Sequence, residues 1–383
     1  MDYCLSHHRI PRLPSTLKPQ SGRSSLFPGS AVVSFRAGGR RRSLAVVAVA
    51  GAGAGHCESS SLNSPLGPRT PSGTDLIGVL QNHPQLFHLA VADELKHLAD
   101  DRDDARNRMF LSDGSPEACL HRRIAQMKEN ECQAAVEDIM YLMIFYKFSE
   151  IKVPLVPSLS RCIYNGRLEI WPSKDWALES IYSFEVLEIV REHIAAVIGL
   201  RANSSVKDHW AITTISKSVL SRIYVASILY GYFLKSALLR LQLEQCMALE
   251  SNDLNPRQRT PIQHHGIKNL LFDRISSMQS ESQSPEESSR EKKPGNLKCY
   301  VMGFDPETLQ RCAKLKSEEA TSLIENHSRA LFGDEKTGSM EDDEVILTSF
   351  SSLKRLVLEA VAFGSFLWET EECINTVYKL KEN

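Results

Sequence analysis

Apolar residues recur at helical spacing along most of the chain beyond residue 73, and this pattern predicts a protein built from helices. The stretch "AAVEDIMYLMIFYKF", which ends at Phe148, is apolar on nearly all sides and predicts a buried helix. No stretch alternates apolar and polar residues as a half-buried strand does. We therefore predict an all-α fold, a multi-helix globular bundle. Its helical stretches start at Asp75 with a break at Pro84 and continue over 115–148, 178–197, 212–249, 305–331 and 349–378.

Two segments have the composition of a helix start. Ser115-Pro116-Glu117 and Asp305-Pro306-Glu307 each offer a capping side chain, a proline at the first helical position and an acid in the first turn. Gly333 stands where a glycine cap would end the helix that begins after Asp305.

The stretch "RLEIWPSKDWALES", residues 167–180, places two of the four tryptophans of the chain around a Pro-Ser-Lys-Asp tetrad. Ser173 would cap the helix that follows, and Asp175 would lie in its first turn, where a negative charge meets the helix dipole. We expect Trp171 and Trp176 to hold the helix start against the core. A ligand platform is the alternative interpretation.

The first fifty residues differ from the rest, with eight basic residues, eight serines and one acid. This bias is typical of organelle transit peptides, and the prolines favour a chloroplast over secretion or mitochondria. We predict a transit peptide over 1–50, a disordered stretch over 51–73, and a first helical part over 74–250. We also predict a low-complexity, disordered linker over 251–297. After it we predict a second helical part over 298–383 that packs on the first.

Charge and cysteine content narrow the classes of partner. Removing residues 1–50 would bring the formal net charge from −2 to −9, and an acidic protein lacks the basic surface that nucleic acid requires. The nine cysteines contain no Cys-x-x-Cys pair. The longest apolar run, "IYVASILYGYFL" over 223–234, is too short to span a membrane. We expect neither nucleic-acid binding nor a transmembrane segment.

Several long motifs carry a family resemblance over about residues 74–380. They are "NGRLEIWPSKDWALESI", "VREHIAAVIGL", "YVASILYGYFLKSALLRLQLE", "FDPETLQRCAKLKSEEATSLIENHSRALFG" and "LKRLVLEAVAFGSFLWETE". They resemble the plant chloroplast family that includes the UV-B-induced chloroplastic protein, whose shared region is a domain of unknown function. The resemblance implies a helical, stress-responsive plastid protein. It implies no reaction, cofactor or catalytic residue.

Candidate sites are few. Glu94 and His97 form a single Glu-x-x-His match, whereas a di-iron helical bundle needs two such motifs and two further glutamates. His193 lies near an apolar helix face, and the aromatic residue Tyr230, with His209 as an axial ligand, could line a pocket for a flat pigment. The alternative is a chance match for Glu94 and His97, and a core position for His193 and the aromatic residue. The sequence contains no Gly-x-Ser-x-Gly, His-Glu-x-x-His or phosphate-loop motif.

These observations favour a non-enzymatic stromal protein, without a cofactor, that binds other plastid proteins and is regulated through its abundance. The alternative is a helical protein that binds a pigment, tetrapyrrole or metal ion, or an enzyme acting on such a ligand.

Overall fold

The computed structural model describes residues 64–199, 212–252, 297–333 and 345–383. The predicted transit peptide and nearly all of the predicted linker lie outside these residues. The elements are α1 (Pro71–Asn82), η1 (Pro84–Leu86), α2 (Phe87–Leu111), α3 (Ala118–Glu150), η2 (Leu159–Arg161), β1 (Ile163–Tyr164), β2 (Arg167–Leu168), α4 (Asp175–Glu179), α5 (Phe184–Ile198), β3 (Ile212–Ser216), α6 (Lys217–Asn252), α8 (Leu297–Met302), α9 (Pro306–Ala313), α10 (Glu318–Phe332), β4 (Val345–Ser349) and α11 (Phe350–Asn375). The prediction of an all-α fold is confirmed.

Helix α11 is the centre of the packing, and it is buried along nearly its whole length. Its closest neighbour is α6, which it crosses at two glycines. A Cβ atom on Gly231 of α6 would overlap the carbonyl oxygen of Val361, and one on Gly364 of α11 would overlap the carbonyl oxygen of Ile228. Since only glycine lets two helix backbones approach this closely, these two positions fix how α6 and α11 cross.

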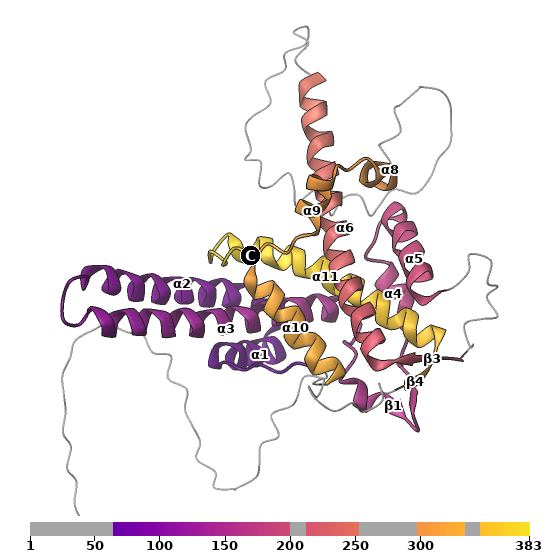
Figure 1. Ribbon diagram of the computed structural model, residues 1–383, viewed down its shortest axis with the longest axis horizontal. Helices are drawn as coiled ribbons and strands as arrows, with labels where there is room; N and C mark the ends of the chain where they lie inside the picture. Colours follow the sequence, from indigo (N-terminus) through magenta and orange to yellow (C-terminus); the bar gives the residue numbers. More distant parts are fainter. Residues whose placement is uncertain (1–63, 200–211, 253–296, 334–344) are drawn as a thin grey trace, which may run out of the picture. The chain divides into compact units, whose positions relative to one another are not determined.

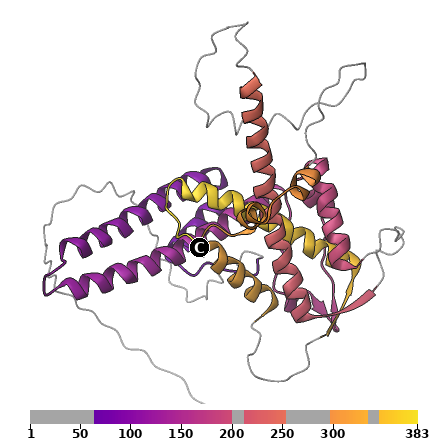
Figure 2. The same cartoon turned by 45° about the horizontal axis from the view of Figure 1, so that its top comes forward.

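The long helices α2 and α3 lie side by side and antiparallel, as both views of the ribbon show (Figures 1 and 2). Apolar residues of α2 at helical spacing, Val91, Leu95 and Leu98, face α3 and are buried. The second half of α3, from Ala135 to Ile144, is buried on all sides, as its sequence predicts. It enters the core that α10 and α11 share.

A small sheet joins distant parts of the chain in the order β1-β2-β4-β3. Strand β3 pairs antiparallel with β4, and β2 pairs parallel with β4. The prediction of a helix from Ile212 is therefore wrong for its first turn: Ile212–Ser216 is a strand, and the helix begins at Lys217. The β-branched run "ITTIS" favours a strand, but it is too short to show a pattern of its own.

The helix start at Asp305 is confirmed. The Asp305 carboxylate accepts a hydrogen bond of 2.7 Å from the amide of Thr308, and Pro306 is the first helical residue. The helix ends at Ala313, however, and Ser317 caps a second helix, α10, which ends at Gly333 as predicted. The start predicted at Ser115 is displaced, because α3 begins at Ala118 without a side-chain cap.

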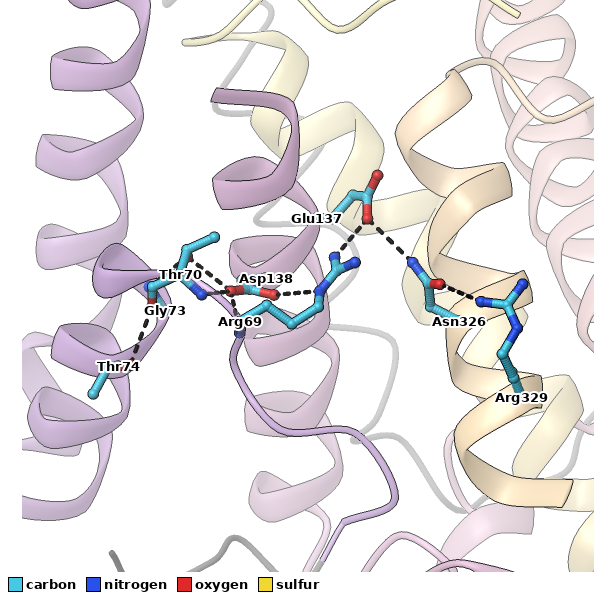
Figure 3. Close-up of polar contacts among 8 residues, drawn as sticks. All are labelled: Arg69, Thr70, Gly73, Thr74, Glu137, Asp138, Asn326 and Arg329. Carbon is cyan, nitrogen blue, oxygen red and sulfur yellow. Dashed lines mark hydrogen bonds and ion pairs between the residues drawn. The ribbon is translucent and has the colours of Figure 1, made fainter. Parts of the chain in front are cut away.

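Residues 64–73 correct the predicted extent of the disordered stretch. They are Ser, Pro and Gly rich, yet Thr70 caps α1, and the backbone amides of Arg69 and Thr70 donate to Asp138 of α3 (Figure 3). The ordering comes from buried acids far along the chain, which local composition does not reveal.

Within the described parts of the chain, no helix combines the length and the apolar content that crossing a membrane requires.

Candidate functional site

Four large aromatic side chains are exposed between the end of β1 and the first residue of α5. Tyr164, Trp171, Trp176 and Phe184 are 78%, 88%, 72% and 72% exposed. We call residues 164–184 the aromatic segment. The prediction that Trp171 and Trp176 pack the helix start against the core is wrong, because both rings face solvent. Isolated exposed apolar residues are ordinary, but four aromatic ones within a single connection are a feature of binding surfaces.

Helix α4 holds Trp176 outward by burying the opposite face. Ala177 and Leu178 of α4 are buried against the core, so the neighbouring Trp176 points away from it. The predicted cap at Ser173 is not formed. Lys174 instead takes the cap position in a left-handed conformation, with φ 50°, and the helix is only five residues long. A second helix, α5, starts after Ser183.

Ion pairs attach α4 to its neighbours. Lys354 of α11 lies 2.9 Å from Glu179 and 3.5 Å from Asp175, and Arg191 of α5 also pairs with Glu179. Burial alone would raise the pKa of Glu179, but its hydrogen bonds from Lys354 and Arg191 outweigh burial and lower that pKa. The helix that carries Trp176 is thus fixed at both ends of its polar face.

Two of the predicted candidates, His193 and Tyr230, do come together. Their rings stack with centroids 4.0 Å apart and an angle of 12° between the planes, and His193 Nε2 lies 3.1 Å from the Ser227 hydroxyl. Burial lowers the pKa of His193 to about 4, so the ring is neutral at physiological pH. Ring contacts continue from Tyr230 to Phe233, Phe304 and Tyr300 in tilted and edge-to-face arrangements, and they pack α8 and the turn after it onto α6.

The other candidates are not brought together. Glu94 is half-buried and His97 exposed on α2. Among the described residues, no group of three or more His, Cys, Asp or Glu side chains could hold a metal ion. His209 lies outside the described residues.

A buried polar network connects four elements of the core. Glu359 of α11 pairs with Arg355 at 2.8 Å and accepts hydrogen bonds from the amide of Val156 at 3.0 and 3.1 Å. The Tyr224 hydroxyl lies 3.5 Å from Glu359 and 2.9 Å from His327 Nε2. These four side chains are at most 1% exposed, so no ligand in solvent can reach them in this conformation.

Burial shifts the pKa values of two residues in this network. It lowers the pKa of His327 to about 3, and it raises the pKa of Glu359 despite the attraction of Arg355. None of these residues is among the candidates that the sequence offers. Opposite charges four residues apart in an otherwise apolar helix, Arg355 and Glu359, are the signal that could have revealed the network.

The chain matches the family described as "Protein of unknown function (DUF760)" over residues 119–247 and 296–375. It is 38% identical over 330 residues to "UV-B-induced protein At3g17800, chloroplastic" from Arabidopsis thaliana, an alignment that covers 82% of this chain and 77% of that relative. No solved structure matches the chain. The aromatic segment lies inside the first of the two matched regions.

Proposed function

The chain belongs to the DUF760 family of proteins of unknown function, and from this membership we propose that it is a stress-associated chloroplast protein that binds other plastid proteins through its aromatic segment. It is made with a transit peptide over residues 1–50 and works in the stroma. Its activity is binding rather than catalysis, and UV-B controls its abundance. The chloroplast and the UV-B response come from the name of the Arabidopsis relative.

The observation that supports binding is the exposure of Trp176 on the firmly held helix α4 and of Trp171 just before it. A tryptophan or tyrosine side chain can bury roughly 150–250 Å². Four such side chains therefore offer on the order of 600 Å², close to what one partner contributes to a standard protein interface. The two ion pairs of Lys354 hold the helix before the partner arrives, which reduces the entropy lost on binding.

Affinity capture from chloroplasts before and after UV-B exposure tests this function. The wild-type chain should retain a reproducible set of proteins, and Trp171→Ser/Trp176→Ser should lose it. The matched control is Phe110→Ser/Leu111→Ser, which removes two exposed apolar side chains from the end of α2. Retention of the same proteins by the tryptophan variant, or of none by the wild type, would refute the proposal.

A pigment, tetrapyrrole or metal site around His193 and Tyr230 is the alternative. The stack of these two rings gives it a location, but each ring already covers a face of the other, so a flat ligand would have to separate them. Visible absorption and metal content of the protein purified from chloroplasts decide between a protein-binding function and a ligand-binding function. A chromophore band that disappears in His193→Leu would favour the alternative.

A further inference from the structure

Residues 64–70 lie against α3 before α1 begins, and two buried acids of α3 hold them there (Figure 3). We call this segment the strap. We propose that the strap sets the limit of proteolytic processing at the N-terminus: any leader is removed upstream of Ser64, and the strap stays as part of the mature domain.

A single carboxylate oxygen of Asp138 holds the backbone of the strap. Its Oδ2 accepts hydrogen bonds from the amides of Arg69 and Thr70, each at 2.8 Å, and from the Thr70 hydroxyl at 2.7 Å. Asp138 is only 3% exposed, so this charge depends on the strap for its hydrogen bonds. A buried carboxylate that loses such partners is strongly destabilising.

The side chain of Arg69 extends the attachment to a third helix. Its guanidinium donates to Glu137 Oε2 at 2.6 Å and to Asp138 Oδ1 at 3.4 Å. The Asn326 side chain of α10 donates to the same Glu137 oxygen at 3.3 Å. Figure 3 shows Arg69 between the two acids, with Asn326 on the other side of Glu137. The strap therefore completes a polar contact between α3 and α10.

Close packing leaves little freedom for the strap to shift. A Cβ atom at Gly73 would come within 2.8 Å of Asp138 Oδ2, so α1 approaches α3 as closely as a glycine permits. The Thr70 hydroxyl also accepts from the Gly73 amide at 3.2 Å and caps α1. Leu66 packs on the core cluster. Loss of the strap would remove a cap, an apolar contact and the partners of two buried acids at once.

Whether a protease can cleave the strap depends on whether the strap is accessible to it. A protease acts on chain that opens away from the fold, and its rate follows the population of the open state. Bonds within the strap are protected as long as Asp138 holds it. Cleavage of the bond between Arg69 and Thr70 reports opening of the strap directly, since trypsin cleaves after arginine.

Limited trypsin digestion of the full chain, followed by mass spectrometry, tests this protection. Cleavage after Arg69 should be faster in Asp138→Asn than in the wild type, by about tenfold or more. Thr70→Val, which removes the hydroxyl but keeps the shape, should also accelerate cleavage. Asp113→Asn, a change of an exposed acid, should behave as the wild type. Circular dichroism confirms that each variant is folded. Equal cleavage rates in the wild type, Asp138→Asn and Thr70→Val would overturn the proposal.

A second measurement examines the protein in its natural setting and rests on the proposed chloroplast location. The N-terminus of the protein isolated from chloroplasts should lie at or before Ser64, and an N-terminus beyond Ser64 would overturn the proposal. Because trypsin digestion uses purified full chain, it tests the strap even if the proposed location or binding function fails.

Discussion

The crossing of α6 and α11 and the aromatic segment place their largest side chains in opposite environments. At the crossing, Gly231 and Gly364 bring the backbones together and Tyr224 and Phe363 are fully buried. In the aromatic segment, Trp171 and Trp176 face solvent although α4, which carries Trp176, is firmly attached. Close packing at the crossing stabilises the protein, so substitutions there should be destabilising. The exposed tryptophan rings of the segment contribute little to stability, and this leaves them available for a partner.

The largest effect is expected at the crossing. Gly364→Ala should lower the free energy of unfolding by about 3 kcal/mol, because the new methyl group overlaps the Ile228 carbonyl and the two helices must separate. Urea denaturation measures the loss. Gly78→Ala in α1 is the matched control, since a Cβ atom there meets nothing within 4 Å, and it should stabilise the protein by about 0.5 kcal/mol. Equal changes in the free energy of unfolding for Gly364→Ala and Gly78→Ala would show that the crossing does not require a glycine.

The buried network of His327 and Glu359 next to the crossing should make the free energy of unfolding depend on pH. In the unfolded chain a histidine has a pKa of about 6.5, whereas His327 has a folded pKa of about 3. The unfolded state therefore binds the proton first, and stability falls as pH falls through this window. Between pH 6.5 and 5, His327 should account for a loss of about 2 kcal/mol.

Comparison with His327→Gln isolates that contribution. Glu359, with its raised pKa, has the opposite dependence: its contribution is present at low pH and is lost as pH rises through its folded pKa. Because Glu359 is present in both proteins, the difference between them reports His327. A stability difference that does not change from pH 7 to pH 5 would show that His327 has the same pKa in the folded and unfolded states.

A smaller effect is expected where the aromatic segment is attached. Lys354→Met removes the two ion pairs between α11 and α4 and should cost about 1 kcal/mol, since the carboxylates of Asp175 and Glu179 are only partly buried. Partner capture should weaken as well, because α4 then keeps only its pair with Arg191. Unchanged capture by a destabilised Lys354→Met would mean that the segment binds without support from α11.

The smallest change in stability is expected at the exposed tryptophans. Trp171→Ser and Trp176→Ser should each alter the free energy of unfolding by no more than about 0.5 kcal/mol, as for other surface positions. Thermal unfolding by circular dichroism checks this. A loss above about 2 kcal/mol would place these rings in the folding core and break the contrast with the crossing.

The sequence predicts the helices of this protein well because its long apolar faces have a clear period. The buried half of α3, the start of α9 at Asp305 and the end of α10 at Gly333 all follow from local patterns. The break between α9 and α10 does not, since the polar stretch around Ser317 continues the helical composition. There Ser317 caps α10 and donates to the buried Glu371 of α11, a residue far along the chain.

The candidate site is less predictable, because exposure is a property of the whole fold. Two tryptophans beside a helix start predict a packed corner, and the local sequence is the same whether the rings face in or out. Their direction is decided by Ala177 and Leu178, which occupy the core, and by Lys354 of α11, which pairs with α4. His193 and Tyr230 could be selected from the sequence as chemically distinctive, but their mutual stacking could not.

The crossing also bears on how such a chain can evolve. The two matched regions meet at Gly231 and Gly364 and again where β4, from the second region, pairs with β2 and β3 of the first. Both contacts join residues on either side of 253–296, so neither requires that connection to have a particular length. The cost of closing a loop grows only slowly with its length. Changes in chain length between α6 and α8 should therefore be tolerated better than a substitution at either glycine.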